Sequence, residues 1–236
     1  MHPTIVSRED WLAARRALLV KELEMTHALD ALRAERRQMP WVRVEKGYVF
    51  DGSDGKCTLI DLFGDRGQLA IYHFMLTPGS DHICPGCSYT MDHVDAARQH
   101  FEQADLAFAA ISRAPIARIE QVKARMGWTF PWVSSGDGDF NYDFGVSFTE
   151  VDRAAGRALY NYGKVKIQKS PDMFGVSVFI KDRDGEIFHT YSTYHRGTEL
   201  LMGAFNWLDL TPKGRNETGG TKSWVRLHDE YPLSSA

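Results

Sequence analysis

Hydrophobic residues near the start of the chain recur at a helical spacing. Ser7 begins a segment rich in Ala, Leu, Glu and Arg that predicts a helix over about residues 7–38, with Asp10 as its partner in a capping box and Pro40 ending it. One stripe of apolar residues has a seven-residue repeat: Trp11, Leu18, Met25, Leu32 and Met39. The stripe indicates either an arm packed on its own domain or a contact in a homodimer.

Short apolar runs after residue 40 predict a sheet whose strands alternate with helices. Two pairs of runs flank Asp/Gly-rich turns, as in β-hairpins. The central runs alternate with segments of helical periodicity. The expected elements are a hairpin over 48–63, a strand over 69–76, a helix over 88–103, a strand over 106–111, a helix over 115–126, a hairpin over 176–191 and a helix over 198–208.

This order predicts an α/β fold, with a thioredoxin-like mixed sheet flanked by helices. The long helix becomes an arm over residues 1–40, and the thioredoxin-like domain extends over 41–211. Residues 129–174 are aromatic and Gly-rich with little periodicity, so we interpret them as an insertion in the domain. Residues 212–236 form a polar C-terminal tail.

Composition narrows the possible partners and the cellular location. The formal net charge of −3 and the pI of about 6.3 give no basis for a nucleic-acid or anionic-membrane partner. No apolar stretch approaches the roughly 18 residues that a membrane span needs. Three cysteines are too few for a secreted disulfide framework, and the N-terminus lacks a signal-peptide pattern. These features predict a cytoplasmic protein.

The most specific chemical signal is Cys84-Pro85-Gly86-Cys87. The pair follows a predicted buried strand and precedes a predicted helix, so we expect it where a strand's exit loop opens a helix. Free N–H groups and the helix dipole there favour a thiolate at Cys84. A thiolate at neutral pH is what disulfide exchange needs. The sequence therefore predicts a redox dithiol, with Cys84 as nucleophile and Cys87 as resolving thiol.

Three neighbours of the pair are candidates for binding substrate or tuning the thiolate. His82 precedes Cys84 and is expected to act on it by charge, and Ser88 lies in the first helical turn with a hydroxyl to donate. Arg113 follows the second central strand, at the same end of the sheet as the cysteines. Its cation is suited to lowering the pKa of Cys84 or holding an anionic substrate.

A metal site is the alternative use of the cysteines. His82 and His93 bracket the pair, and two His with two Cys form a zinc tetrahedron in many proteins. A helix running from the pair turns His93 away from the loop, so we expect no metal. The sequence also has no Walker A or dinucleotide Gly motif, so no cofactor is expected. Electrons would come from a reducing partner protein or a small thiol.

Motifs along the chain resemble a bacterial thioredoxin-like family known as domain of unknown function 899, in the thioredoxin superfamily. The resemblance covers about residues 5–231. Its landmarks are Tyr72-His73-Phe74-Met75, Cys84-Pro85-Gly86-Cys87-Ser88, Ser112-Arg113-Ala114-Pro115, Arg125-Met126-Gly127-Trp128, Phe140-Asn141-Tyr142-Asp143-Phe144, Thr190-Tyr191-Ser192-Thr193-Tyr194 and His228-Asp229-Glu230-Tyr231. The resemblance implies a fold more than it implies an activity.

Two departures from ordinary thioredoxins bear on function. Those proteins have Gly-Pro between the cysteines, whereas Pro85-Gly86 stands here, and Phe174-Gly175 occupies the expected place of their cis-proline. The favoured function is thiol–disulfide exchange with a disulfide-containing protein or a small thiol substrate. The alternatives are a thiol peroxidase of peroxiredoxin-like type, although the Ser/Thr-x-x-Cys peroxidatic pattern is absent, and a non-enzymatic binding module.

Overall fold

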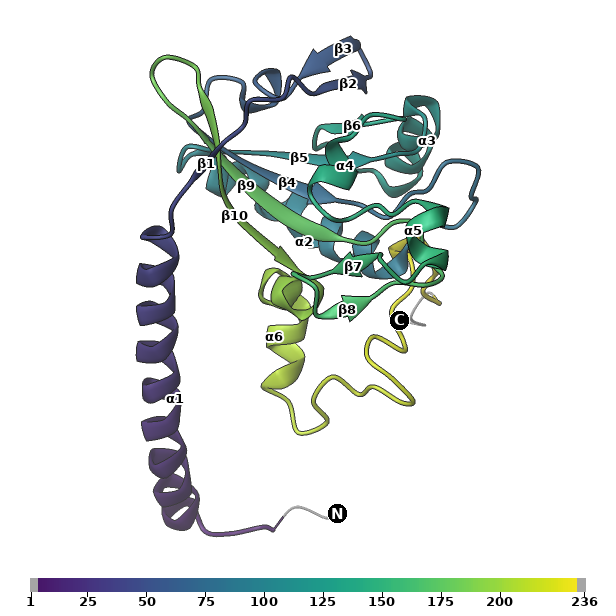
Figure 1. The fold of residues 1–236 in the computed structure, drawn as a ribbon. Coiled ribbons are helices and arrows are strands. Elements are labelled where there is room, and N and C mark those ends of the chain that lie inside the picture. Colours follow the sequence, from purple (N-terminus) through teal and green to yellow (C-terminus); the bar gives the residue numbers. More distant parts are fainter. Residues whose placement is uncertain (1–3, 233–236) are drawn as a thin grey trace. The chain divides into compact units, whose positions relative to one another are not determined.

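The computed structural model describes residues 4–232, which divide into two compact units on either side of the Pro40–Trp41 peptide bond (Figure 1). The first unit is the helix α1 (Arg8–Arg37), capped by Ser7, whose Oγ accepts from the N–H of Asp10 at 3.1 Å. Acidic residues in its first turn and basic residues in its last turn complement the helix dipole. No residue of α1 is buried, and the five residues of the heptad stripe are 45–66% exposed.

The second unit is built on an eight-stranded sheet in the order β1-β10-β9-β4-β5-β6-β2-β3. The pairs β4–β5 and β5–β6 are parallel, and the other neighbours are antiparallel. The strands are β1 (Val42–Arg43), β2 (Val49–Gly52), β3 (Gly55–Thr58), β4 (Gln68–His73), β5 (Leu106–Ser112), β6 (Trp132–Ser134), β9 (Gly175–Lys181) and β10 (Ile187–Tyr194). The hairpin pairs β2–β3 and β9–β10 and the parallel pair β4–β5 were expected from the sequence. The strands are shorter than expected, because β3 ends at Thr58 and β4 ends at His73.

Helices and short turns complete this unit. They are α2 (Pro85–Glu102), α3 (Ile116–Met126), α4 (Phe140–Asp143), α5 (Glu150–Ala154), α6 (Gly203–Asp209), and the 3-10 turns η1 (Asp61–Phe63), η2 (His195–Leu201) and η3 (His228–Glu230). Residues 129–174 contain α4, α5 and a separate two-stranded sheet of β7 (Leu159–Tyr160) and β8 (Val165–Lys166), whereas β6 joins the main sheet. The helix expected over 198–208 is divided into η2 and α6 at Met202.

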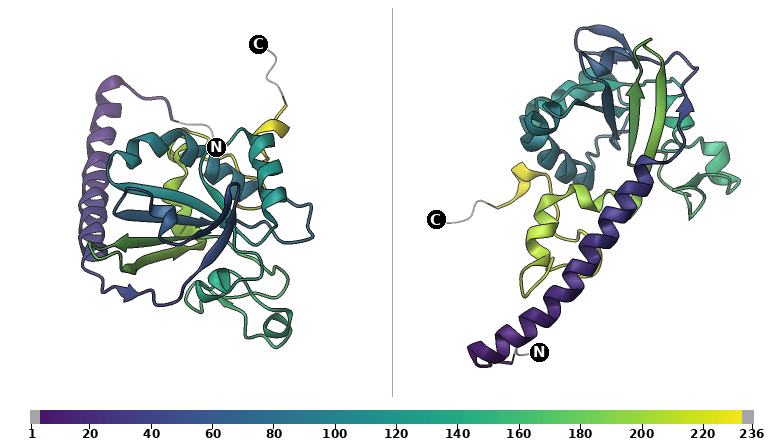
Figure 2. Two further views of the ribbon diagram at one scale, coloured as in Figure 1. Left: turned by 90° about the horizontal axis from the view of Figure 1, so that it is seen from above. Right: turned by 90° about the vertical axis from the view of Figure 1, so that its left-hand side faces the viewer.

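The two-residue period of the central strands divides the core between the faces of the sheet. In β4, Tyr72 packs in a cluster with residues of α2 and α3, whereas Leu69 and Ile71 pack in a second cluster with Phe63 and Phe179. Both faces of β4 and β5 are buried, as is typical of a parallel strand pair between layers. The second unit is therefore a thioredoxin-like α/β fold with a curled sheet flanked by helices (Figure 2).

The C-terminal segment after α6 has little regular structure, but several of its side chains pack against the domain. Val225 packs against Tyr89 of α2 and Phe205 of α6, and Leu227 enters the cluster that contains Cys87. Beyond it, Arg125 of α3 binds Asp229 through two hydrogen bonds of 2.7 and 3.0 Å. We call residues 212–232 the C-terminal strap. No helix within residues 4–232 is long and apolar enough to cross a membrane.

Candidate dithiol site

Helix α2 begins at the cysteine pair itself. Cys84 is the N-cap with extended backbone (φ −64°, ψ 112°), and Pro85 occupies the first turn, where a missing N–H costs nothing. The N–H of Cys87 donates to Sγ of Cys84 at 3.4 Å. The helix starts three residues earlier than periodicity predicted, because Pro and Gly in the first turn carry no apolar signal.

The two thiols are different chemically. Hydrogen bonding from the Cys87 side chain, aided by the N–H groups of Cys87 and Gly86 and the charge of Lys222, lowers the pKa of Cys84 to about 7 despite partial burial. Burial raises the pKa of Cys87, and the neighbouring Cys84 adds to that rise. Near neutral pH these shifts favour the thiolate at Cys84 and the protonated thiol at Cys87.

Accessibility follows the same division. Cys84 is partly exposed, whereas Cys87 is buried among the core residues between β4 and α2. Tyr72 of β4 lies behind Cys87, and burial, reinforced by the charge of the two cysteines, raises the pKa of its phenol. Tyr72 was part of a landmark motif but had no assigned role. Of the two thiols, only Cys84 is accessible from solvent.

The structure places the predicted neighbours in different environments. Ser88 is buried in the first turn of α2, and its Oγ donates to the carbonyl of Cys84 at 3.0 Å. The hydroxyl proton of Ser88 is therefore directed at a backbone carbonyl and not at Sγ of Cys84. His82 is exposed in the loop before the pair, where its backbone N–H donates to Oγ of Ser80 at 3.2 Å.

Arg113 is held by a buried carboxylate. Its Nε and Nη2 donate to Asp172 at 2.7 and 3.1 Å, and Nη1 donates to the hydroxyl of Tyr142 at 3.0 Å. Thr77 and Ser147 donate to the same carboxylate, each at 2.6 Å. This bidentate pair ties the loop after β5 to the segment before β9, an arrangement that no sequence spacing indicated.

His93 binds the first turn of a neighbouring helix. Its Nε2 accepts from the N–H of Ala204 at 3.0 Å, in the first turn of α6, so Nδ1 carries the proton that it donates to the carbonyl of Tyr89 at 2.6 Å. Both ring nitrogens are thus engaged. No group of three or more His, Cys, Asp or Glu side chains within residues 4–232 is arranged to hold a metal ion.

Lys222, in the C-terminal strap, is a residue of this site that sequence reasoning missed. Its charge reaches both cysteines. The polar stretch around Lys222 has no periodicity, and more than a hundred residues separate it from the pair. The only sequence signal nearby is the apolar pair Trp224-Val225, which indicates that the tail packs against something.

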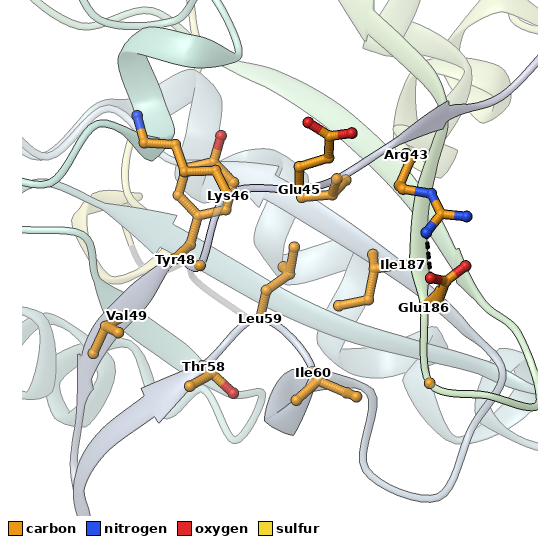
Figure 3. A pocket seen from close by; sticks show the side chains of 13 residues that line it. Arg43, Glu45, Lys46, Tyr48, Val49, Thr58, Leu59, Ile60, Glu186 and Ile187 are labelled. Atoms are coloured by element: carbon orange, nitrogen blue, oxygen red, sulfur yellow. Dashed lines mark hydrogen bonds and ion pairs between the residues drawn. The ribbon is translucent and has the colours of Figure 1, made fainter.

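A pocket in the second unit lies away from the dithiol. It has a volume of about 570 Å³ and is formed by the β1–β2 connection, the segment after β3 and the β9–β10 turn (Figure 3). Leu59 and Ile187 line it, and the ion pair of Arg43 with Glu186 stands at its rim. Neither cysteine of the pair contributes to its lining. The dithiol and this pocket are therefore separate features of the second unit.

The fold and the dithiol at a helix start define a thioredoxin-like protein. Residues 1–231 match the family described as bacterial proteins of unknown function (DUF899), and the chain belongs to that family. No curated protein has a significant sequence match.

Solved structures include several similar folds. Peroxidoxin BcpB of Mycobacterium tuberculosis is 13% identical with a TM-score of 0.47, covering 72% of this chain and 97% of its own. A variant of peroxiredoxin Q from Xanthomonas campestris is 19% identical with a TM-score of 0.44, covering 72% and 98%. A Bacteroides thetaiotaomicron protein, provisionally assigned as a disulfide isomerase, is 16% identical with a TM-score of 0.41, covering 76% and 94%.

Proposed function

We propose that this chain is a thiol–disulfide oxidoreductase that uses Cys84 and Cys87. The supporting observation is the partly exposed N-cap sulfur of Cys84, which accepts the N–H of Cys87 and has its pKa lowered to about 7. Thiolate is the attacking form in disulfide exchange, and a pKa near the ambient pH gives the best balance of thiolate fraction and nucleophilicity. Substrates are disulfides of proteins or of small thiols.

The reaction has two exchange steps. The Cys84 thiolate attacks one sulfur of the substrate disulfide, forms a mixed disulfide and releases the other sulfur as a thiolate, which takes up a proton. Cys87 then loses its proton and attacks Sγ of Cys84, which closes the Cys84–Cys87 disulfide and releases the second substrate thiol. A dithiol protein or small thiol supplies two electrons and two protons to restore the pair.

The first step prepares the second. The charge on Cys84 contributes to the raised pKa of Cys87. When Cys84 enters a mixed disulfide, that negative charge disappears. The pKa of Cys87 then falls, although burial still raises it, so the resolving thiol loses its proton more readily after the first step. Burial of Cys87 meanwhile keeps it from attacking substrate directly.

The test is trapping of the intermediate. Cys87→Ser should accumulate a mixed disulfide with glutathione or with a disulfide-bonded model peptide, and Cys84→Ser should not. The wild type should catalyse reduction of the same peptide, and Cys57→Ser should behave like the wild type. If neither single variant traps substrate and the wild type has no activity, the exchange proposal fails and a binding module remains.

A peroxide-consumption assay separates exchange from peroxidase chemistry. In a peroxidase, Cys84 would reduce peroxide to water or an alcohol and become a sulfenic acid, which Cys87 would condense to the same disulfide with loss of water. Rapid peroxide turnover, with slow reduction of the peptide disulfide, would contradict exchange as the main activity.

A further inference from the structure

Lys222 enters the dithiol site from the C-terminal strap. A Cβ added to Gly86 would lie 3.8 Å from both Cδ and Nζ of Lys222 and 4.0 Å from Sγ of Cys84. The ammonium group and the sulfur therefore approach the same point beside the first turn of α2. Because Gly86 has no side chain, this space is open, and Cδ and Nζ of Lys222 border it.

Two aromatic rings lie near the ammonium group. Its Nζ lies 5.6 Å from the ring centre of Phe174 and 5.9 Å from that of Phe205. Within residues 4–232, no carboxylate lies at ion-pair distance from Nζ of Lys222, whereas the partly buried Arg98, Arg113 and Arg215 each have such a partner. A half-buried cation without a carboxylate needs another source of negative charge.

The cysteines provide most of that charge. Burial lowers the pKa of Lys222, and the charges of Cys87 and Cys84 oppose this effect most strongly. The carboxylate of Glu199 opposes it to a smaller extent, and the guanidinium of Arg215 adds to the lowering. Reciprocally, the charge of Lys222 helps to lower the pKa of Cys84. The interaction spans about 135 residues of sequence and exists only while the strap is folded against the domain.

Contacts within the strap fix the position of Lys222. Its backbone N–H is bound by the carboxylate of Glu217, and its backbone is left-handed (φ 62°). Trp224 follows closely and donates from Nε1 to the carbonyl of Arg215 at 2.7 Å. The buried side chains of Val225 and Leu227 then pack in two different core clusters, each of which contains residues of α2.

We propose that Lys222 is the counter-ion of the Cys84 thiolate and that the C-terminal strap is thereby part of the redox site. The proposal rests on the proposed function for its use in exchange, while the charge pairing is testable in the resting protein. Lys222 acts as a positioning residue: its charge favours the thiolate at Cys84 before attack and, after the mixed disulfide forms, the thiolate at Cys87.

The experiment measures the pKa of Cys84 in the full-length reduced protein. Iodoacetamide labelling of Cys84 is followed by mass spectrometry between pH 5 and 9 in wild type, Lys222→Met, Lys222→Gln and Lys222→Arg, with the exposed tail variant Lys213→Met as control. Removing the Lys222 ammonium group from beside Cys84 should raise the pKa of Cys84 by about one unit. The fraction of Cys84 labelled at pH 6 should then fall roughly tenfold. Lys222→Arg should retain the wild-type profile within about twofold.

Folding is monitored by Trp fluorescence and by thermal unfolding, so that loss of the strap is detected. Both neutral variants should raise the pKa with the strap still folded. An unchanged pKa in both variants, with disulfide exchange intact in the wild type, would overturn the role of Lys222 and leave the proposed function standing. A pKa that depends on Lys222 in a protein without exchange activity would remove the proposed function alone.

Discussion

The N–H of Cys87 donates to Sγ of Cys84 across 3.4 Å, so the side chain of Cys84 caps the N-terminus of helix α2. Pro85 between them has no N–H, and the first available donors of the helix belong to Gly86 and Cys87. Both contribute to the lowered pKa of Cys84. The order Pro-Gly thus directs two successive amide groups at the sulfur, and the helix terminus stabilises its negative charge.

The pKa difference between the thiols predicts a simple pH profile. Alkylation of Cys84 should rise as the pH rises through about 7 and level off near 8, because thiolate is the reactive form. Cys87 and Cys57, whose pKa values burial raises, should react appreciably only above about pH 9. Site-resolved mass spectrometry of the labelled protein measures all three. A common profile for the three cysteines would contradict the assignment of Cys84 as nucleophile.

The buried pair of Arg113 and Asp172 predicts a stability effect. Their side chains are only 12% and 4% exposed, so Arg113→Met leaves a buried carboxylate without its cation. Breaking such a pair costs about 3–5 kcal/mol, which urea unfolding should detect. The exposed Arg183→Met is the control and should change stability by less than about 0.5 kcal/mol.

The same variant tests whether Arg113 tunes the thiolate. Because its guanidinium is bound by Asp172, we expect the pKa of Cys84 in Arg113→Met to stay near 7 as long as the protein remains folded. A rise of one unit or more, measured by the labelling profile, would restore the thiolate-tuning role that its position after β5 suggested.

His73 predicts the response to acid. Burial lowers its pKa to about 3, and its Nε2 is 2.8 Å from Oγ of Ser177. The unfolded chain takes up a proton near pH 6.5, whereas the folded chain does so only near pH 3. Stability should therefore fall as the pH drops between these values, by up to about 1.4 kcal/mol per pH unit for this group. His73→Gln should flatten this slope in urea unfolding, and the exposed His27→Gln should not.

The exposed stripe of α1 predicts self-association. Trp11, Leu18, Met25, Leu32 and Met39 are 45–66% exposed. Apolar residues in a continuous stripe favour contact with another apolar surface, and we propose that a second copy supplies it. Deleting residues 1–39 should then convert a dimer to a monomer in light scattering, with Cys84 labelling intact. Leu18→Glu with Leu32→Glu should do the same, whereas a full-length monomer at tens of micromolar would exclude the dimer.

Local patterns were sufficient for the elements around the dithiol. The apolar runs that form β4 and β5 are buried on both faces, so almost every residue in them is apolar. Such a continuous apolar run indicates a buried strand directly. The cap at Ser7 and the turns of both hairpins depend on residues within three or four positions of each other. The start of α2 was less clear, because Cys84, Pro85 and Gly86 define it by capping rather than by periodicity.

By itself, the sequence determined the long N-terminal helix, the two hairpins, the central elements from β4 to α3 and the cysteine pair, because each depends on neighbouring residues and on short periods of hydrophobicity. Only the tertiary structure decided which charges surround that pair. It bound Arg113 to Asp172, 59 residues away, and brought Lys222 of an irregular strap to Cys84. Such long-range pairings leave no trace in local spacing, since they arise when distant segments pack together. The position of Lys222, for example, depends on the packing of Val225 and Leu227 against the core.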